Sequence, residues 1–317
     1  MSDRRPLVIA HRGACGYLPE HTLEAKALAY GFGADFLEQD VVVSRDDRLI
    51  VLHDVHLDRV TDVAERFPGR ARDDGRYYVR DFDLEELRTL SVWERFGDEA
   101  GREPVFPTRF PARSGHFRIA ALDDELAMIA GLNRASGREV GIYPEIKRPA
   151  WHREEGVDAA ALLLDALARH GYRDPASRVF LQCFDAAELR RVREELGCRL
   201  RLVQLIGDND WGEAATDYDA LQTEEGLAGI AEYADAVGPW LRQLVRAAPI
   251  DGEPVSSGFV GRAHAAGLAV HPYTFRADAV EPGFGDFAAM VRWFADSLAV
   301  DGLFTDFPDL ALAALRR

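Results

Sequence analysis

The chain has 317 residues, enough for one large α/β domain or two smaller ones, and its apolar fraction of 47% is ordinary for a globular protein. The net charge of −16 argues against non-specific binding to nucleic acid or to an anionic membrane surface. The three cysteines, Cys15, Cys183 and Cys198, form no C-x-x-C motif, so the sequence indicates neither a disulfide framework nor a zinc cluster.

The first residues of the chain contain no apolar segment typical of an export signal, and no apolar run reaches membrane-spanning length. We therefore expect no stable membrane insertion and a cytoplasmic location for the chain as written. A periplasmic location is expected instead if an export signal has been trimmed. The oligomeric state stays open at this point.

The first secondary-structure elements are predicted within residues 7–54. An apolar run at residues 7–10 predicts a strand that stops at His11-Arg12-Gly13. Residues 19–30 are predicted as a helix, with Thr22 as its N-cap and with Gly31 and Gly33 ending it. Residues 36–43 and 49–52 predict two strands of a hairpin, because a polar turn separates them.

The pattern changes over residues 55–118, where prolines and glycines are frequent and only residues 84–90 have helical spacing. We interpret this stretch as an inserted subdomain without an independent core. After it, predicted strands and helices alternate. The eight predicted β-segments lie near residues 8, 38, 142, 180, 202, 236, 270 and 303. This rhythm is typical of a (β/α)8 TIM barrel, here predicted as one domain over residues 1–317.

Three carboxylates follow the predicted strands of such a barrel, whose functional side chains lie at the C-terminal ends of its strands. Glu38 and Asp40 are two residues apart on one strand and therefore share a face, and Glu145 ends the next barrel strand. Oxygen ligands of this kind predict a hard divalent cation, Ca²⁺ or Mg²⁺. The alternative is three solvated or ion-paired acids; the joint placement at successive strand ends favours the metal.

Two histidines and two cations flank this acidic group. His11 and His53 are predicted as a general acid and base, since imidazole titrates near neutral pH. Arg12 and Lys147 are predicted to bind phosphate oxygens. The alternatives are structural histidines and internal ion pairs with the acids. Further predicted substrate contacts are Glu20, which could orient Arg12, and the strand-end residues Gln182, Phe184, Tyr273 and Phe304.

The ordered motifs of the chain resemble the glycerophosphodiester phosphodiesterase family, and closely its GlpQ-type bacterial members. The matching segments are His11-Arg12-Gly13-Ala14, Pro19-Glu20-His21-Thr22, Leu37-Glu38-Gln39-Asp40, Leu52-His53-Asp54, Pro144-Glu145-Ile146-Lys147, Leu181-Gln182-Cys183-Phe184, His271-Pro272-Tyr273-Thr274 and Gly302-Leu303-Phe304-Thr305-Asp306.

The resemblance implies a TIM barrel with an insertion after the second strand. It implies metal ligands at Glu38, Asp40 and Glu145, catalytic histidines at His11 and His53, and phosphate-binding side chains at Arg12 and Lys147.

The reaction that the resemblance implies is hydrolysis of glycerophosphodiesters, such as glycerophosphocholine or glycerophosphoethanolamine, to an alcohol and sn-glycerol 3-phosphate. It implies that the glycerol 2-hydroxyl attacks phosphorus and that a cyclic phosphate forms, which water then opens. Two alternatives stay open. One is a protein that binds or senses glycerophosphodiesters without turnover, and the other is a phospholipase acting on another phosphodiester. The loop at residues 207–225 matches the family poorly, and Trp211 within it has no assigned role.

Overall fold

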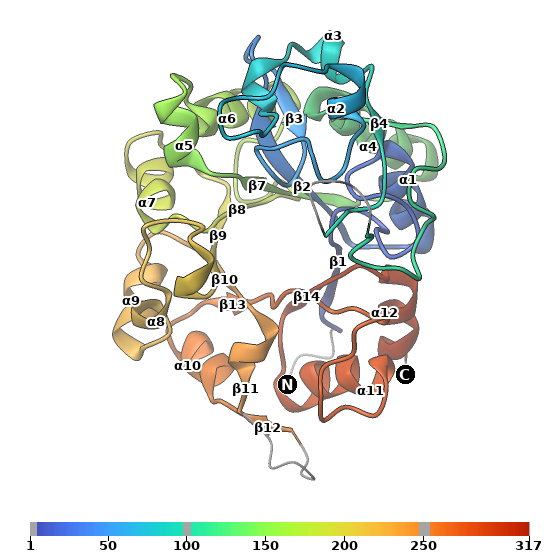
Figure 1. Cartoon of the computed structure of the whole chain (residues 1–317). Helices are drawn as coiled ribbons and strands as arrows, with labels where there is room; N and C mark the ends of the chain where they lie inside the picture. Colours follow the sequence, from blue (N-terminus) through green and yellow to red (C-terminus); the bar gives the residue numbers. More distant parts are fainter. Residues whose placement is uncertain (1–4, 98–102, 247–253, 317) are drawn as a thin grey trace.

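The computed structural model describes residues 5–97, 103–246 and 254–316. Within these residues, eight parallel strands surround a common centre, with helices on the outside (Figure 1). In order around the barrel they are β1 (Leu7–Ala10), β2 (Phe36–Val43), β7 (Gly141–Ile146), β8 (Phe180–Cys183), β9 (Arg201–Ile206), β10 (Ala236–Pro239), β13 (Ala269–Val270) and β14 (Gly302–Thr305). The predicted (β/α)8 barrel is confirmed.

The barrel closes where its last strands meet its first. Strand β14 pairs with β1 along four residues, from Leu7 opposite Gly302 to Ala10 opposite Thr305. Strand β13 joins β14 through backbone hydrogen bonds that include the amide of Asp301 to the carbonyl of Val270, 2.9 Å. The strand predicted near residue 270 is only two residues long as a regular strand, and its continuation completes the ring through single bridges.

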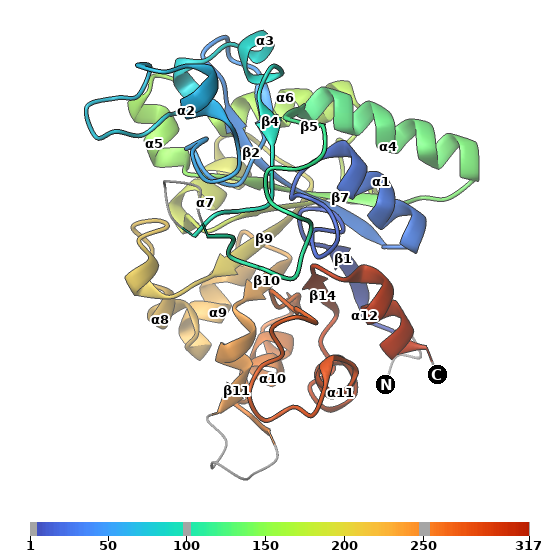
Figure 2. The same ribbon diagram turned by 45° about the vertical axis from the view of Figure 1, so that its right-hand side comes forward.

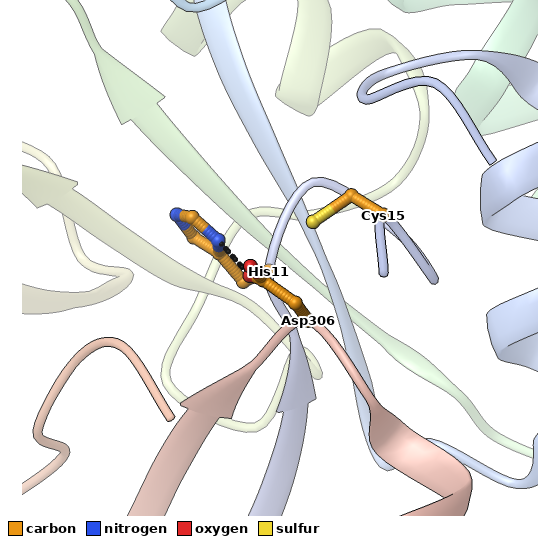
Figure 3. Close-up of side chains that lie close together, drawn as sticks. All are labelled: His11, Cys15 and Asp306. Carbon is orange, nitrogen blue, oxygen red and sulfur yellow. Dashed lines mark hydrogen bonds and ion pairs between the residues drawn. The ribbon is translucent and has the colours of Figure 1, made fainter. Parts of the chain in front are cut away.

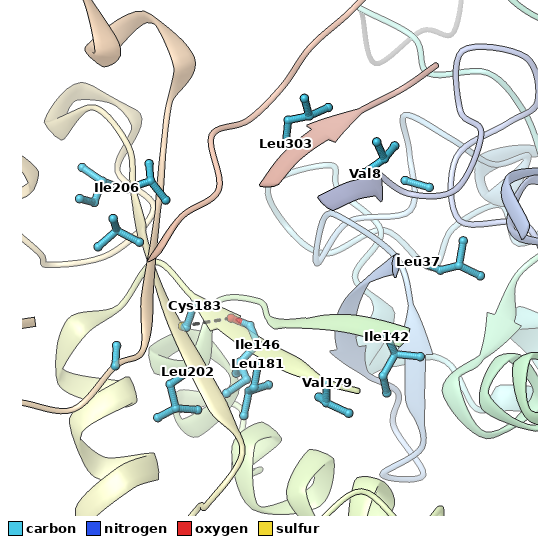
Figure 4. Packing of buried hydrophobic residues seen from close by; sticks show 14 of the residues in the cluster. Val8, Leu37, Ile142, Ile146, Val179, Leu181, Cys183, Leu202, Ile206 and Leu303 are labelled. Carbon is cyan, nitrogen blue, oxygen red and sulfur yellow. Dashed lines mark hydrogen bonds between the residues drawn. The ribbon is translucent and has the colours of Figure 1, made fainter. Parts of the chain in front are cut away.

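Alternation along the strands separates an inner from an outer core. Inward-facing Phe36, Tyr143, Phe180 and Phe304 pack together and fill the barrel interior. Residues of the opposite parity, such as Leu37, pack outward against the helices (Figure 4). These rings fill the interior. The inward-facing positions that follow them along the strands therefore lie at the C-terminal end of the barrel.

Helices of the barrel follow its strands along the chain. They are α1 (Leu23–Phe32), α4 (Leu122–Ser136), α5 (Pro149–Glu154), α6 (Ala159–Arg169), α7 (Ala186–Glu194), α8 (Tyr218–Leu221), α9 (Glu224–Ala231), α10 (Phe259–Ala265), α11 (Phe287–Arg292) and α12 (Pro308–Leu315). Shorter elements are the 3-10 turns η2 (Asn209–Trp211) and η3 (Leu241–Leu244), the π-helical turn η4 (Trp293–Ser297) and the two-stranded β11 (Val245–Arg246) and β12 (Val255–Ser256).

Several predicted boundaries are wrong in detail. Helix α1 begins at Leu23, after its N-cap Thr22, and runs through Gly31 to end at Gly33 in a left-handed conformation. The predicted loop at residues 207–225 contains η2, α8 and the start of α9. In α8, Asp217 caps the helix by accepting hydrogen bonds from two backbone amides, a local signal that the sequence carried.

The predicted insertion lies between β3 (Leu49–Val51) and β6 (Ala120–Ala121). It contains α2 (Val63–Arg66), η1 (Val79–Asp81), α3 (Leu84–Leu87), β4 (Ser91–Val92) and β5 (Phe117–Arg118). In Figure 2, α2, α3 and β4 lie together at one end of the molecule, near β2. This stretch has a hydrophobic cluster that includes Val42 of β2 and Ile50 of β3. The insertion is therefore fixed to the barrel by a shared core.

Candidate active site

A cavity of about 340 Å³ opens at the C-terminal ends of the barrel strands. All of the predicted site residues except Glu20 line it. These residues are His11, Arg12, Glu38, Asp40, His53, Glu145, Lys147, Gln182, Phe184, Tyr273 and Phe304. They converge because each lies on the inward-facing side of a strand toward its C-terminal end, or in the first turn after a strand.

The three carboxylates come from adjacent strands. Strand β2 places Asp40 directly opposite Glu145 of β7, and Glu38 is one inward-facing position earlier on β2. One oxygen from each of the three acids lies within 4.8 Å of the others, and all three side chains are buried. This spacing is compatible with a common cation held by oxygen ligands.

The surrounding contacts leave room for such a cation. Asp40 Oδ1 and Gln182 Oε1 are buried without a hydrogen-bond partner, although buried polar atoms normally have one. Burial raises the pKa of Glu145 well above its ordinary value, with Lys147 opposing and Asp40 adding to the shift. Crowded buried carboxylates of this kind are stabilised in the charged form by a cation. The donor set therefore fits a hard divalent ion.

His21, which received no role in the sequence interpretation, fixes Asp40. Its Nε2 donates a hydrogen bond to Asp40 Oδ2, 2.7 Å away. Burial lowers the pKa of His21 to about 3, so the ring is neutral. Although burial acts in the opposite direction, Lys147 and His21 hold the pKa of Asp40 well below its usual range.

His11 follows β1 and is oriented by Asp306, which follows β14. The Nδ1 atom of His11 lies 2.6 Å from Asp306 Oδ1 (Figure 3). The other oxygen of Asp306 accepts hydrogen bonds from Arg109 Nη2 at 2.7 Å and from Arg276 Nε at 2.8 Å. Although burial opposes the shift, Arg276, His11 and Arg109 hold the pKa of Asp306 well below its usual range. A charged Asp306 selects the tautomer of His11 that carries its proton on Nδ1 and leaves Nε2 free to accept one.

His53 is paired with an aspartate in the same way as His11. Its Nδ1 lies 2.5 Å from Asp54 Oδ1, and Asp54 Oδ2 accepts a hydrogen bond from Arg95 Nη1 at 2.6 Å. Burial, together with Arg12 and Lys147, lowers the pKa of His53. The site therefore holds two histidine–aspartate pairs, each backed by an arginine of residues 55–118, Arg95 or Arg109.

The two cations of the cavity are also held by acids. Arg12 lies in a left-handed conformation, with φ 56°, that directs its backbone amide to Glu38 Oε2 at 2.7 Å. The adjacent Gly13 also has a positive φ, and a Cβ there would lie 2.8 Å from the backbone of Ala25. Lys147 lies 2.9 Å from Glu145, and the acids Glu145 and Asp40 raise the pKa of Lys147 against the effect of its burial.

Glu20 differs from its predicted role as a substrate contact. Its carboxylate pairs with Arg12 Nη1 at 2.9 Å and with Arg95 Nη2 at 2.6 Å, and it does not line the cavity. A carboxylate bound by two guanidinium groups can orient Arg12 but is badly suited to contact an anionic phosphate. The second suggestion made from the sequence, orientation of Arg12, matches this geometry.

A second group that could in geometry hold a metal consists of His11, Cys15 and Asp306 (Figure 3). Two arginines already contact Asp306, and Arg109 also lies 4.0 Å from Cys15 Sγ. Burial raises the pKa of the Cys15 thiol well above its ordinary value, so this side chain is neutral. The positive charge and the neutral thiol disfavour a cation here.

The sequence interpretation assigned no role to His21, Asp54, Arg95, Arg109, Asp306 or Arg276. Asp54 and Asp306 could have been found, because both stand at strand or hairpin ends within the motifs quoted above. The arginines of residues 55–118 carried no comparable signal, since that stretch has few regular elements.

Comparison with known proteins matches this site to a family. The family model of the glycerophosphoryl diester phosphodiesterases matches residues 11–310. The chain belongs to the glycerophosphoryl diester phosphodiesterase family.

Glycerophosphodiester phosphodiesterases of Haemophilus influenzae and Treponema pallidum are 42% and 37% identical to the chain. Each alignment spans 98% of this chain, together with 90% and 91% of those proteins respectively.

Solved structures agree on the fold. A candidate glycerophosphoryl diester phosphodiesterase from Silicibacter pomeroyi has a TM-score of 0.74 at 25% identity, covering 99% of this chain and 94% of that one. An Oleispira antarctica phosphodiesterase, solved with the product sn-glycerol-3-phosphate, has a TM-score of 0.66 at 19% identity, covering 98% and 96%.

Membership of the glycerophosphoryl diester phosphodiesterase family confirms the predicted family and the predicted enzyme class, a phosphodiester hydrolase. In the part of the chain that the structure describes, no helix has the length and apolar character needed to cross a membrane.

Proposed function

We propose that the chain hydrolyses glycerophosphodiesters, such as glycerophosphocholine and glycerophosphoethanolamine, to an alcohol and sn-glycerol 3-phosphate. The observation that carries this proposal is the convergence of two oriented histidines, two cations and three carboxylates on one cavity. A phosphodiester carries one negative charge, and its transition state gains charge on the phosphoryl oxygens. Catalysis of phosphoryl transfer consists largely of positioning and stabilising that charge.

The proposed reaction uses His11 and His53 as acid and base. One histidine accepts the proton of the glycerol 2-hydroxyl, whose oxygen attacks phosphorus. The bond from phosphorus to the head-group oxygen breaks, and the other histidine donates a proton to that oxygen. Water then attacks phosphorus and the bond from phosphorus to the glycerol 2-oxygen breaks. The histidine that gave its proton accepts one from this water, and the other histidine returns its proton to the 2-oxygen. Asp54 and Asp306 support these transfers by stabilising each imidazolium as it forms.

Arg12 and Lys147 bind the phosphate oxygens in this proposal. Arg12 offers a planar guanidinium, and Lys147 a compact charge. Glu38, Asp40 and Glu145 would hold a hard divalent cation, because the ligands are oxygens only. Ca²⁺ is proposed, with Mg²⁺ as the alternative. Such an ion would supply positive charge that polarises the phosphoryl group. Gln182, Phe184, Tyr273 and Phe304 are proposed as further walls of the substrate site, in a single domain that carries residues 55–118 as an insertion.

The test is the release of sn-glycerol 3-phosphate from glycerophosphocholine, with a chelator and after adding back Ca²⁺ or Mg²⁺. We expect release that the chelator abolishes and Ca²⁺ restores. The variants His11→Asn and His53→Asn should each lose at least about a hundredfold in kcat. His170→Asn is the matched control, since His170 pairs with Asp123 at 3.0 Å and is not among the cavity-lining residues.

Full turnover in both cavity-histidine variants would rule out the proposed acid and base. Binding of glycerophosphocholine without release, with several head groups tried, would instead identify a binding protein.

A further inference from the structure

One half of the cavity is lined by aromatic rings, two of which, Phe184 and Tyr273, have so far been given only as walls of the substrate site. Phe184 follows β8, Trp211 lies in η2 after β9, Trp240 follows β10 and Tyr273 follows β13. The ring centroids of Trp211 and Trp240 are 5.2 Å apart, and those of Phe184 and Tyr273 are 5.9 Å apart. The carboxylates and histidines described above line the other half. The cavity is therefore polar at one end and aromatic at the other.

Local contacts fix these rings in place. Gly207 allows their approach, because a Cβ at this position would lie 2.9 Å from the Trp211 ring and 3.2 Å from the Phe184 ring. The hydroxyl of Tyr273 donates a hydrogen bond to the Ile206 carbonyl at 2.9 Å. The side chain of Gln243 connects the two loops, donating to the Gly207 carbonyl at 2.7 Å and accepting from the Trp240 amide at 3.0 Å.

A carboxylate accompanies the rings. Glu213 lines the same cavity, two residues after Trp211, and its nearest ion pair is a 3.8 Å contact with Arg148 Nε. Aromatic faces with a nearby carboxylate form the type of site that recognises organic cations, quaternary ammonium groups above all.

We propose that Phe184, Trp211, Trp240, Tyr273 and Glu213 form a head-group site for a cationic alcohol of the choline class. The inference rests on the proposed function, because the alcohol is the leaving group of that reaction. The phosphate would bind at the polar end, and the trimethylammonium group would extend between the rings. Trp211, with 41% of its surface exposed, lies at the rim, where a bound cation would cover it.

The first experiment measures binding alone. Choline is compared with 3,3-dimethylbutan-1-ol, which has the same shape without the charge, by titration calorimetry on the whole protein. We expect choline to bind roughly tenfold more tightly, as cation–π and carboxylate contacts in a partly desolvated site would give. Trp240→Leu and Glu213→Gln should each reduce this preference. Trp240→Phe, which keeps an aromatic face, should retain most of it.

Trp293→Leu is the control for losing a tryptophan. Trp293 packs against Phe284 and Phe294 and is not among the cavity-lining residues. This variant should keep the preference for choline. Equal binding of the two alcohols to the unaltered protein would overturn the proposal, because the rings would then recognise shape and not charge. The same conclusion would follow if Trp240→Leu and Glu213→Gln kept the full preference.

The second experiment compares kcat/KM for glycerophosphocholine and glycerophosphoglycerol, whose head group is neutral. We expect the ratio to favour glycerophosphocholine and to fall roughly tenfold in Trp240→Leu, mainly through KM. A ratio near one in the unaltered enzyme would overturn the head-group site while leaving the proposed hydrolysis intact. Choline binding without hydrolysis of any glycerophosphodiester would instead overturn the proposed function and leave the cation site standing.

Discussion

At the scale of single residues, the site depends on side chains that fix the orientation and the tautomer of its two histidines. Asp54 and Asp306 each fix a histidine through Nδ1, and both carry negative charge because arginines contact them. An oriented aspartate selects the histidine tautomer and stabilises the imidazolium when it forms. We therefore expect the aspartates to matter for the rate almost as much as the histidines.

Asp54→Asn tests this expectation. The asparagine amide would donate to His53 Nδ1 and leave the proton on Nε2, so the ring could no longer accept a proton in the cavity. We expect kcat to fall roughly a thousandfold with little change in KM, measured as glycerol 3-phosphate release from glycerophosphocholine. Asp74→Asn, at an exposed turn, is the control. An unchanged kcat in Asp54→Asn would show that His53 needs no orienting carboxylate.

Glu94 is a buried acid in the same region with a carboxylate oxygen that has no hydrogen-bond partner. Burial, and then Glu20, raise the pKa of Glu94 from 4.5 to about 8. The folded protein thus prefers the protonated form of Glu94. Burying the ionised carboxylate lowers the free energy of unfolding, and this loss is absent below pH 4.5 and grows as pH rises toward 8.

Glu94→Gln should remove this pH dependence. We expect urea unfolding to show similar stability for the variant and the unaltered protein at pH 4, and a gain on the order of 3 kcal/mol for the variant at pH 8. Stability that changes equally with pH in both proteins would show that Glu94 ionises normally in the folded chain.

At the scale of elements, residues 55–118 act as a support for the barrel end. Arg95 contacts both Asp54 and Glu20, and Glu20 in turn contacts Arg12. Arg109, which belongs to the same insertion, contacts Asp306 and Asp278. The insertion therefore supplies arginines that contact the aspartates paired with both histidines and the glutamate paired with Arg12.

Arg95→Met should lower kcat by roughly ten- to a hundredfold, because Asp54 and Glu20 lose a shared partner and their orientation loosens. Arg95→Lys should restore only part of the activity, since one ammonium cannot donate in the same plane to both acids. Arg88→Met, on the surface of the same insertion, should behave like the unaltered enzyme. A loss of activity that parallels a loss of thermal stability would point to folding and away from positioning.

A buried ion pair joins helix α1 to helix α4, and its lysine also contacts β2. Lys26 Nζ donates to Glu125 Oε1 at 2.8 Å and to the Glu38 carbonyl, and both ionic side chains are fully buried. Lys26→Met would leave the Glu125 charge buried without its partner, at a cost of about 3–5 kcal/mol in urea unfolding. The double variant Lys26→Met with Glu125→Leu should recover much of this loss. Additive losses in the double variant would show that the two residues stabilise the fold independently.

At the scale of the whole molecule, a strongly acidic chain, with a net charge of −16, is proposed to bind an anionic substrate. The negative net charge does not prevent such binding, because the barrel places the cationic side chains of Arg12 and Lys147 in the cavity lining. A divalent ion would add to this local positive charge. Binding of such an ion to the folded state alone would also stabilise the whole chain.

Calcium should therefore raise the unfolding temperature. At a Ca²⁺ concentration about a hundred times Kd, we expect about 2.7 kcal/mol of stabilisation, measured by calorimetric melting against chelator. Glu145→Gln should lose this shift, whereas Glu85→Gln, at an exposed acid, should keep it. Equal melting with Ca²⁺ and with chelator, across a range of concentrations, would contradict a calcium site formed by the three carboxylates.

The sequence by itself determined the barrel and the strand-end positions of its polar residues. Strand periodicity is local, so Glu38 and Asp40 had to share a face, and a parallel barrel brings all C-terminal strand ends to one side. The polar strand-end residues that line the cavity could therefore be predicted without contacts.

Only the tertiary structure decided which groups hold these residues in place. Arg109 and Asp306 are 197 residues apart in the chain, and Arg95 and Asp54 are joined across an irregular segment with little periodicity. The aromatic half of the cavity likewise combines rings from four different strand ends. Such partners are chosen by how loops fold over the barrel, and loop conformation depends on packing and hydrogen bonds that no local pattern encodes.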